Sequence, residues 1–202
     1  MPKLLLATGN PAKVREYSML LQGAPFTLTT VADEGIDINV EETGQTLEEN
    51  AKLKAVAYAA QSQSLVAADD SGLEVDALGG EPGPLSARYA GEGASDQERI
   101  AFLLSRLQGT PWEKRSARFR CVIAIASPSG ETQLCEGECR GYITFEPKGN
   151  QGFGYDPIFY LPELDKTMAE LSMEEKNRVS HRSRAARKAL EVLNNLQKEP
   201  AK

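Results

Sequence analysis

The sequence predicts an α/β protein with a mixed β-sheet, and two patterns support this. In the N-terminal part of the chain, short hydrophobic segments alternate with helical ones, as they do in parallel β–α–β units. In the middle, segments 117–126 and 132–141 flank the turn sequence Ser-Pro-Ser-Gly, which is the pattern of an antiparallel hairpin. By its length of 202 residues the chain can be one large domain or two small ones, and we expect a single domain over residues 1–202.

The first predicted elements are a strand, a helix and a second strand. Residues 3–7 (KLLLA) form a short hydrophobic run that is typical of a buried strand. Asn10 is a favoured N-cap residue and proline is favoured at the first helical position, so a helix is predicted from Pro11 to about Leu21. The β-branched residues of the segment Thr27 to Asp33 favour a second strand.

Three further helices are predicted from capping boxes, in which a Ser or Thr is followed three residues later by Glu. The boxes are Thr46 with Glu49, Ser95 with Glu98, and Ser172 with Glu175. The first helix is expected to reach about Ala60, and the second to stop before Gly109 and Pro111. The C-terminal helical segment is expected to break near Ser180 and Ser183.

Composition and charge restrict the class of protein. The chain is 41% hydrophobic and 26% charged, and its longest apolar runs are far shorter than the roughly 18 residues that span a membrane. The N-terminal apolar run is too short for a signal peptide, so we expect a cytoplasmic protein with no membrane partner. The net charge of −6 argues against a nucleic-acid partner. Cys135 and Cys139 could suggest a metal pair, but nothing supplies two more soft ligands, so the three cysteines are expected to be reduced thiols.

Two adjacent carboxylates, Asp69 and Asp70, lie between a predicted strand at Leu65–Ala68 and another at Leu73–Val75. One interpretation is a surface turn, because Asp-Asp-Ser-Gly is good turn-forming sequence. The alternative is a site for a hard cation, in which Glu41 joins the pair. Such oxygen ligands suit Mg²⁺ that is shared with substrate phosphates.

The segment Thr8–Lys13 (TGNPAK) is a candidate anion site. A strand leads through a Thr-Gly-Asn turn directly into a capped helix, whose N-terminus presents N–H groups and the positive end of the helix dipole. Lys13 lies in the first helical turn, where its ammonium group can reach the same anion. The spacing of a P-loop is absent, and an ordinary strand-to-helix connection is the alternative interpretation.

The segment Gly152–Pro157 (GFGYDP) is a candidate site for a flat ring. Its glycines let the backbone approach a ligand, and an exposed aromatic side chain can stack on a nucleobase. A glycine-rich loop with a core phenylalanine is the alternative. His181, the only histidine, lies in the segment Lys176–Lys188, which holds six Lys or Arg and no acidic residue.

Five sequence blocks, taken together and in this order, resemble the inosine triphosphate pyrophosphatase family, which hydrolyses non-standard purine nucleoside triphosphates. The blocks are LLLATGNPAKVRE, EETGQTLEENAKLKA, ADDSGLEVDALGGEPGPLSARYAG, GFGYDPIF and ELSMEEKNRVSHRSRA. The resemblance extends from Lys3 to about Leu196. It implies an elongated, two-lobed α/β fold around a long mixed sheet, a central substrate cleft and a homodimer.

The resemblance also implies a role for individual residues. Asp70 is implied as the catalytic base and an Mg²⁺ ligand, Glu41 as a second ligand, and Ser71 as a substrate contact. The residues implied to bind the triphosphate are Thr8, Gly9, Asn10, Lys13, Lys54 and Arg88. The residues implied to bind the nucleobase are Phe153, Gly154, Tyr155, Asp156, Lys176, His181 and Arg182. No direct role is implied for Asp69.

The implied reaction is Mg²⁺-dependent hydrolysis of ITP, dITP and XTP to the nucleoside monophosphate and pyrophosphate. Two alternatives stay open: a related pyrophosphatase for modified pyrimidine triphosphates, and a nucleotide sensor without catalysis. The pair of Glu41 and Asp70 argues against the sensor, because a sensor has no need of an activated water.

Overall fold

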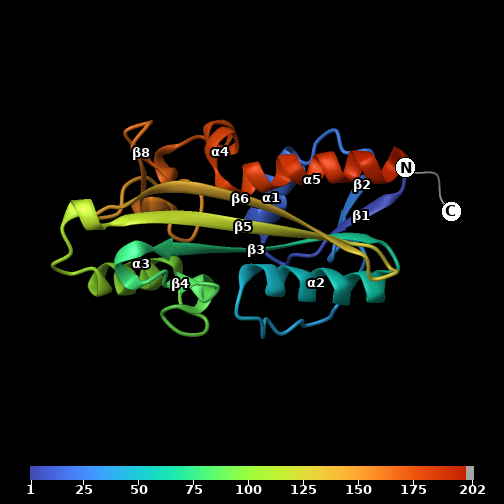
Figure 1. Cartoon of the computed structure of the whole chain (residues 1–202), viewed down its shortest axis with the longest axis horizontal. Coiled ribbons are helices and arrows are strands. Elements are labelled where there is room, and N and C mark those ends of the chain that lie inside the picture. The colour runs from blue at the N-terminus through green and yellow to red at the C-terminus, as the bar shows by residue number, and fades with distance from the viewer. Residues whose placement is uncertain (199–202) are drawn as a thin grey trace. The chain divides into compact units, whose positions relative to one another are not determined.

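The structure, a computed structural model, describes residues 1–198, which form one mixed β-sheet with helices (Figure 1). The strands are β1 (Lys3–Leu6), β2 (Thr27–Thr30), β3 (Leu65–Val75), β4 (Pro82–Gly83), β5 (Ser116–Ala126), β6 (Thr132–Ile143), β7 (Phe159–Leu161) and β8 (Lys166–Thr167). Their order is β2-β1-β3-β5-β6-β7-β8, and β4 pairs with β3. Strand β1 is parallel to β2 and β3, whereas β4 is antiparallel to β3. The predicted α/β class and mixed sheet are confirmed.

The α-helices begin where the sequence predicts. They are α1 (Pro11–Leu20), α2 (Leu47–Ser62), α3 (Asp96–Arg106), α4 (Met173–Val179) and α5 (His181–Lys198). The side chain of Asn10 caps α1, and reciprocal capping boxes start α2, α3 and α4. The predicted C-terminal break is also present, because Ser180 has an extended conformation between α4 and α5.

The chain divides into two compact units, each assembled from separate segments. Unit 1 comprises Met1–Asp70, Cys121–Gly137 and the C-terminal segment from Arg182, and unit 2 comprises Ser71–Arg120 and Glu138–His181. Strands β3, β5 and β6 contribute residues to both. The single-domain organisation, the central cleft and the homodimer stay predictions.

Unit 1 has helices on both faces of its strands, and the alternation of side chains along the strands explains this arrangement. On one face, Leu4, Leu6 and Ala67 pack with residues of α1 and α5. On the other face, Leu5 and Val66 pack with residues of α2. Figure 1 shows α5 above strands β3 and β5 and α2 below them. Strands covered on both faces are expected for the parallel part of a sheet.

Unit 2 has its own hydrophobic core. Leu103 of α3, Phe119 of β5 and Phe159 of β7 are among its buried members. The rings of Phe119 and Phe159 lie with their centroids 4.4 Å apart. Strands β7 and β8 and the short strand β4 were not predicted, because segments of two or three residues carry too little periodicity.

Strand β3 differs from the prediction in one important respect. It is a single strand of 11 residues that continues through Asp69 and Asp70, where two separate strands were expected. Both carboxylates are buried, at 3% and 6% exposure, so the interpretation as a surface turn is wrong. Partners for each carboxylate, described below, override the low strand propensity of aspartate.

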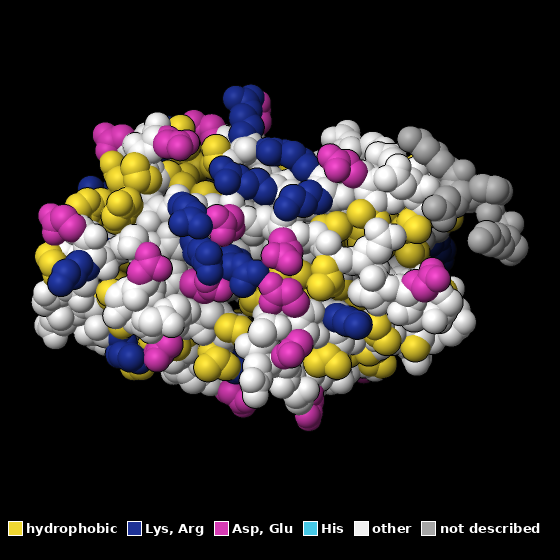
Figure 2. Space-filling view, in the orientation of Figure 1, with side chains coloured by type: hydrophobic (Ala, Val, Ile, Leu, Met, Phe, Trp, Pro, Cys, Tyr) yellow, Lys and Arg dark blue, Asp and Glu magenta, His cyan; other side chains and the backbone are white. Residues whose placement is uncertain are grey.

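The surface carries mixed charge. Figure 2 shows most of the visible Lys and Arg side chains gathered over the upper middle of the face that it displays, with Asp and Glu side chains between and around them, and no histidine is visible. In the basic segment Lys176–Lys188, Lys176 and Arg182 are buried, whereas the other four basic residues, Arg178, Arg184, Arg187 and Lys188, are exposed. The three cysteines are free and buried, as predicted. Among residues 1–198, no helix has the length and apolar character needed to cross a membrane.

Candidate active site

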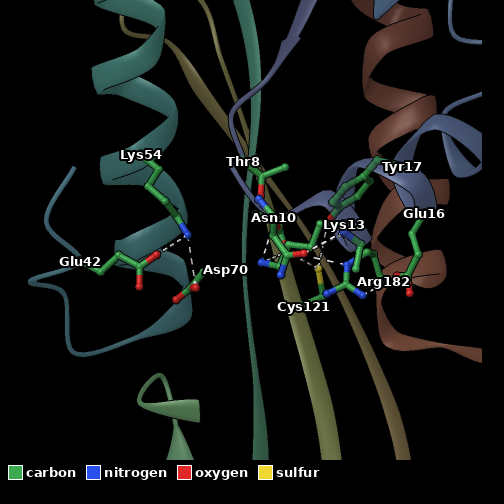
Figure 3. A network of polar contacts seen from close by, with 12 residues as sticks. Thr8, Asn10, Lys13, Glu16, Tyr17, Glu42, Lys54, Asp70, Cys121 and Arg182 are labelled. Atoms are coloured by element: carbon green, nitrogen blue, oxygen red, sulfur yellow. Dashed lines mark hydrogen bonds and ion pairs between the residues drawn. The ribbon is translucent and has the colours of Figure 1, made fainter. Parts of the chain in front are cut away.

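Strand β3 directs its two adjacent carboxylates to opposite faces of the sheet, because side chains alternate along a strand. Asp70 meets Lys54 from α2, whereas Asp69 meets Lys13 from α1. Figure 3 shows the Lys54 group on one side of β3 and the Lys13 group on the other. Each acidic side chain therefore has a lysine partner of its own, and the charges of Lys13 and Lys54 act on both carboxylates.

On the α2 face, one ammonium group joins two carboxylates. Lys54 Nζ lies 2.6 Å from Glu42 Oε1 and 3.4 Å from Asp70 Oδ1. Oδ2 of Asp70 is buried and has no hydrogen-bond partner among residues 1–198. Burial, the largest influence, raises the pKa of Asp70, and the charges of Glu42 and Asp69 add to this effect, whereas Lys54 opposes it. Because burial disfavours the ionised carboxylate of Asp70, a further positive charge beside it would stabilise that ionised form.

The donor set on this face fits a hard divalent cation. Among residues 1–198 no cluster of three or more His, Cys, Asp or Glu side chains is present to hold a metal ion. Mg²⁺ does not need such a cluster, because it keeps several waters and is usually bound by one or two carboxylates together with substrate phosphates. The orphaned Oδ2 of Asp70 and the nearby carboxylate of Glu42 provide such a pair.

The structure places Glu42, not Glu41, in contact with the lysine that binds Asp70. Glu41 is exposed, and its side chain makes no ion pair within residues 1–198. The loop that carries both is held by Asn50 of α2, whose Oδ1 accepts a hydrogen bond from Gly44 N at 2.8 Å. A side chain at Gly44 would collide with Asn50, so this close approach requires glycine. The metal-binding role of Glu41 stays a prediction.

On the α1 face, Asp69 is held by positive charge. Lys13 Nζ lies 2.8 Å from Asp69 Oδ2, and Arg182 Nε lies 3.9 Å from the same oxygen. Burial by itself raises the pKa of Asp69, but Lys13, Arg182 and Lys54 outweigh it, so the pKa is lowered. Asp69 is thus an ionised group that fixes the position of Lys13.

Arg182, which lies near Asp69, also takes part in a buried ion pair. Arg182 Nη1 donates to Glu16 Oε2 at 2.6 Å, and both side chains are almost completely buried (Figure 3). Tyr17, next to Glu16 on α1, contacts Cys121 of β5 at 3.5 Å between hydroxyl and sulfur. Burial raises the pKa of Cys121 to about 12, so the thiol is neutral.

The loop Thr8–Lys13 has the predicted strand-to-helix geometry, with one difference. The side chain of Asn10 accepts hydrogen bonds from Ala12 N (2.9 Å) and Lys13 N (3.4 Å), and Pro11 has no N–H. The first N–H groups of α1 are therefore bonded to Asn10. The helix dipole and the ammonium group of Lys13 are the features that attract an anion here.

A second group of predicted residues is brought together within unit 2. Lys176 Nζ donates to Asp156 Oδ2 at 2.6 Å, and both residues are 3% exposed. The same oxygen accepts a hydrogen bond from Phe153 N at 3.0 Å, and Lys176 Nζ lies 5.0 Å from the centre of the Phe153 ring. The side chain of Asp156 also fills the space where a side chain at Gly152 would lie. Asp156 therefore shapes this loop and holds Lys176 against the aromatic ring.

The remaining predicted residues of unit 2 have varied surroundings. Ser71 and Arg88 are half-buried, whereas His181 is buried with its ring stacked on Phe119 at 4.7 Å between centroids. Tyr155 is buried and donates from its hydroxyl to the carbonyl oxygen of Ser86 at 2.9 Å. A contact of any of these groups with substrate stays a prediction.

Two residues of the site were not singled out by the sequence. They are Glu42, the neighbour of the predicted ligand Glu41, and Glu16. Glu16 lies three residues after Lys13 on α1, so the two share one face of the helix. Glu16 could therefore have been predicted from its position, as an acidic residue on the same helix face as the predicted phosphate-binding Lys13.

Comparisons with known proteins give a consistent result. A model of the Ham1 family matches residues 4–192. The dITP/XTP pyrophosphatase of Halalkalibacterium halodurans is 53% identical over 185 residues, which cover 92% of this chain and 95% of that protein. The dITP/XTP pyrophosphatase of Bacillus subtilis is 49% identical over 193 residues, covering 96% of this chain and 98% of that protein. The solved structure of the Staphylococcus aureus Ham1 protein superposes with a TM-score of 0.86 at 44% identity, covering 96% and 99% of the two chains. The family resemblance predicted from the sequence is confirmed, and the chain belongs to the Ham1 family.

Proposed function

We propose that the protein hydrolyses non-standard purine nucleoside triphosphates (ITP, dITP and XTP) to the monophosphate and pyrophosphate. The observation that carries this proposal is Asp70, a buried carboxylate with one unsatisfied oxygen and a raised pKa, placed beside Lys54 and Glu42. A perturbed acidic group of this kind is typical of a functional site. The relatives named dITP/XTP pyrophosphatase support the substrate class.

In this proposal, Asp70 and a neighbouring glutamate hold Mg²⁺, which when bound stabilises the charge that develops on the substrate phosphates. Asp70 also accepts a proton from the attacking water. Lys54 and Lys13 each bind a phosphate oxygen through an ammonium group, and the dipole of α1 adds to the attraction. Asp69 keeps Lys13 in place, as its 2.8 Å ion pair indicates.

We expect pyrophosphate as the direct product. The phosphate-binding groups of the Thr8–Lys13 loop hold the leaving diphosphate as one unit, and the bond that breaks is the α–β phosphoanhydride. With ITP and Mg²⁺, inorganic phosphate is therefore expected only after inorganic pyrophosphatase is added. Direct release of single phosphates with accumulation of IDP would contradict this mechanism.

A panel of triphosphates separates the alternatives. Turnover of dITP and XTP in preference to modified pyrimidine triphosphates supports the proposed substrate class, and the reverse preference favours the related pyrophosphatase. Binding of ITP without turnover at excess Mg²⁺ identifies a sensor.

We also expect kcat/KM for ITP to exceed that for ATP by about 10²-fold, because sites built around a specific hydrogen bond reject the wrong partner strongly. Hypoxanthine has an acceptor oxygen at C6, whereas adenine has an amino donor there. Lys176 can only donate, so a 6-amino group facing it leaves donors without acceptors. Phe153→Ala serves as the control: loss of ring stacking should lower kcat/KM for ITP and ATP alike. Equal kcat/KM values for ITP and ATP in the wild type would contradict the proposed base recognition.

A further inference from the structure

Two segments of unit 2 are joined through the first turn of α3. The carboxylate of Asp96 accepts a hydrogen bond from the backbone N–H of Gly154, with 2.6 Å between Oδ2 and N. Its other oxygen forms an ion pair with Arg99, one turn later on the same helix. Arg99 in turn donates from Nη1 to the carbonyl oxygen of Ala87 at 2.5 Å. One carboxylate and one guanidinium group thus link the loop that contains Gly154 to the segment that contains Ala87.

The geometry points to Asp96 and Arg99 as positioning residues for substrate binding. This inference rests on the proposed function, and on the roles that the family resemblance implies for Arg88 in phosphate binding and for residues 153–156 in base binding. Arg88 directly follows Ala87, so the bond from Arg99 fixes the backbone from which the Arg88 side chain extends. The bond from Gly154 fixes the base-binding loop to the same helix.

The bonds of Asp96 are not needed to cap α3. The helix start is already satisfied by Ser95 Oγ, which accepts from Glu98 N at 3.2 Å, and by Glu98, which accepts from Ser95 N at 2.7 Å. The Asp96 carboxylate is directed instead at Gly154, whose φ of 63° lies in the left-handed region. A backbone N–H held by an ionised acceptor makes a stronger bond than one held by a neutral acceptor. Asp96 therefore stabilises one conformation of the loop.

A second contact joins the same two segments. The hydroxyl of Tyr155 donates to the carbonyl oxygen of Ser86 at 2.9 Å in a buried position. Ser86 Oγ also accepts from Leu73 N of β3 at 2.9 Å and donates to Gly83 O at 2.6 Å. If the contacts of Asp96 and Arg99 are lost, the bond from Tyr155 to Ser86 still joins the two segments. We therefore expect weaker substrate binding with little loss of folding stability.

The test is steady-state kinetics with dITP and saturating Mg²⁺. We expect Asp96→Ala to raise KM about tenfold, the effect of losing one charge-assisted hydrogen bond, while kcat at saturation stays within about twofold. Asp96→Asn keeps an acceptor for Gly154 and should recover part of the affinity. Glu98→Ala, two residues further along the same helix, is the matched control: it should lower the melting temperature and leave KM unchanged.

A double-mutant cycle tests whether the two residues act as a unit. We expect Arg99→Ala to raise KM, and the double variant to show no more than the larger of the two single effects. A KM for Asp96→Ala within about twofold of the wild type, or multiplying effects in the double variant, would overturn the inference. A wild-type protein that does not hydrolyse dITP contradicts the proposed function instead, so the two failures are distinguishable.

Discussion

Replacement of Asp70 by asparagine is expected to lower kcat for dITP at least about 10²-fold, because general acid–base assistance alone contributes roughly 10²–10⁴-fold. The change removes a negative charge at the proposed Mg²⁺ site and the proposed proton acceptor together. The shape of the side chain is kept, so the fold should be unaffected. The measurement is kcat at saturating dITP and Mg²⁺, with a thermal melt of both proteins to confirm folding.

Asp69→Asn is the matched control for this prediction. The residue is adjacent and also buried, but its partner is Lys13 at 2.8 Å on the opposite face of β3. Loss of its charge weakens the hold on Lys13, so we expect KM to rise and kcat to fall much less than in Asp70→Asn. Near-wild-type kcat in Asp70→Asn, or an equal loss in both variants, would rule out the assignment of Asp70.

Replacement of Arg182 by alanine is expected to lower the free energy of unfolding by about 3–5 kcal/mol, the usual cost of removing one partner from a buried ion pair. The variant leaves the Glu16 carboxylate without its 2.6 Å bond to Arg182 Nη1. Urea denaturation without nucleotide measures the effect. Because no substrate is present, the result does not depend on a role for Arg182 in base recognition.

The control for Arg182→Ala lies on the same helix. Arg184 is exposed on α5, so Arg184→Ala should change the unfolding free energy by no more than about 0.5 kcal/mol. A double variant with Glu16→Leu and Arg182→Met should recover much of the lost stability, because matched apolar residues can replace a buried ion pair. Equal stability of Arg182→Ala and the wild type would show that the ion pair contributes nothing.

Local features of the fold could be predicted from the sequence. A capping box needs only a hydroxyl and a glutamate three residues apart, so the starts of α2, α3 and α4 were visible without any tertiary information. The break at Ser180 and the strand-to-helix turn at Asn10 are equally local. These features agree between sequence and structure because neighbours within four residues determine them.

Contacts between distant segments could not be predicted in this way. The pair of Glu16 and Arg182 joins residues 166 positions apart, and Lys13 and Asp69 are 56 apart. The continuity of β3 depends on such partners, since local propensity favours a turn at Asp-Asp-Ser-Gly. The choice of Glu42 over its neighbour as a partner of Lys54 depends on how the loop is held by Asn50.

The alternation of Asp69 and Asp70 along β3 limits how the length of this strand can change. Insertion or deletion of one residue between Leu65 and Ala68 would turn every following side chain to the other face. Asp70 would then face Lys13, and the α2 face would receive Ser71 or Asp69, depending on the direction of the shift. A change of two residues would keep the parity of the strand. It would still move Asp70 by about 7 Å along the strand and away from Lys54, so the site fixes the length of this segment.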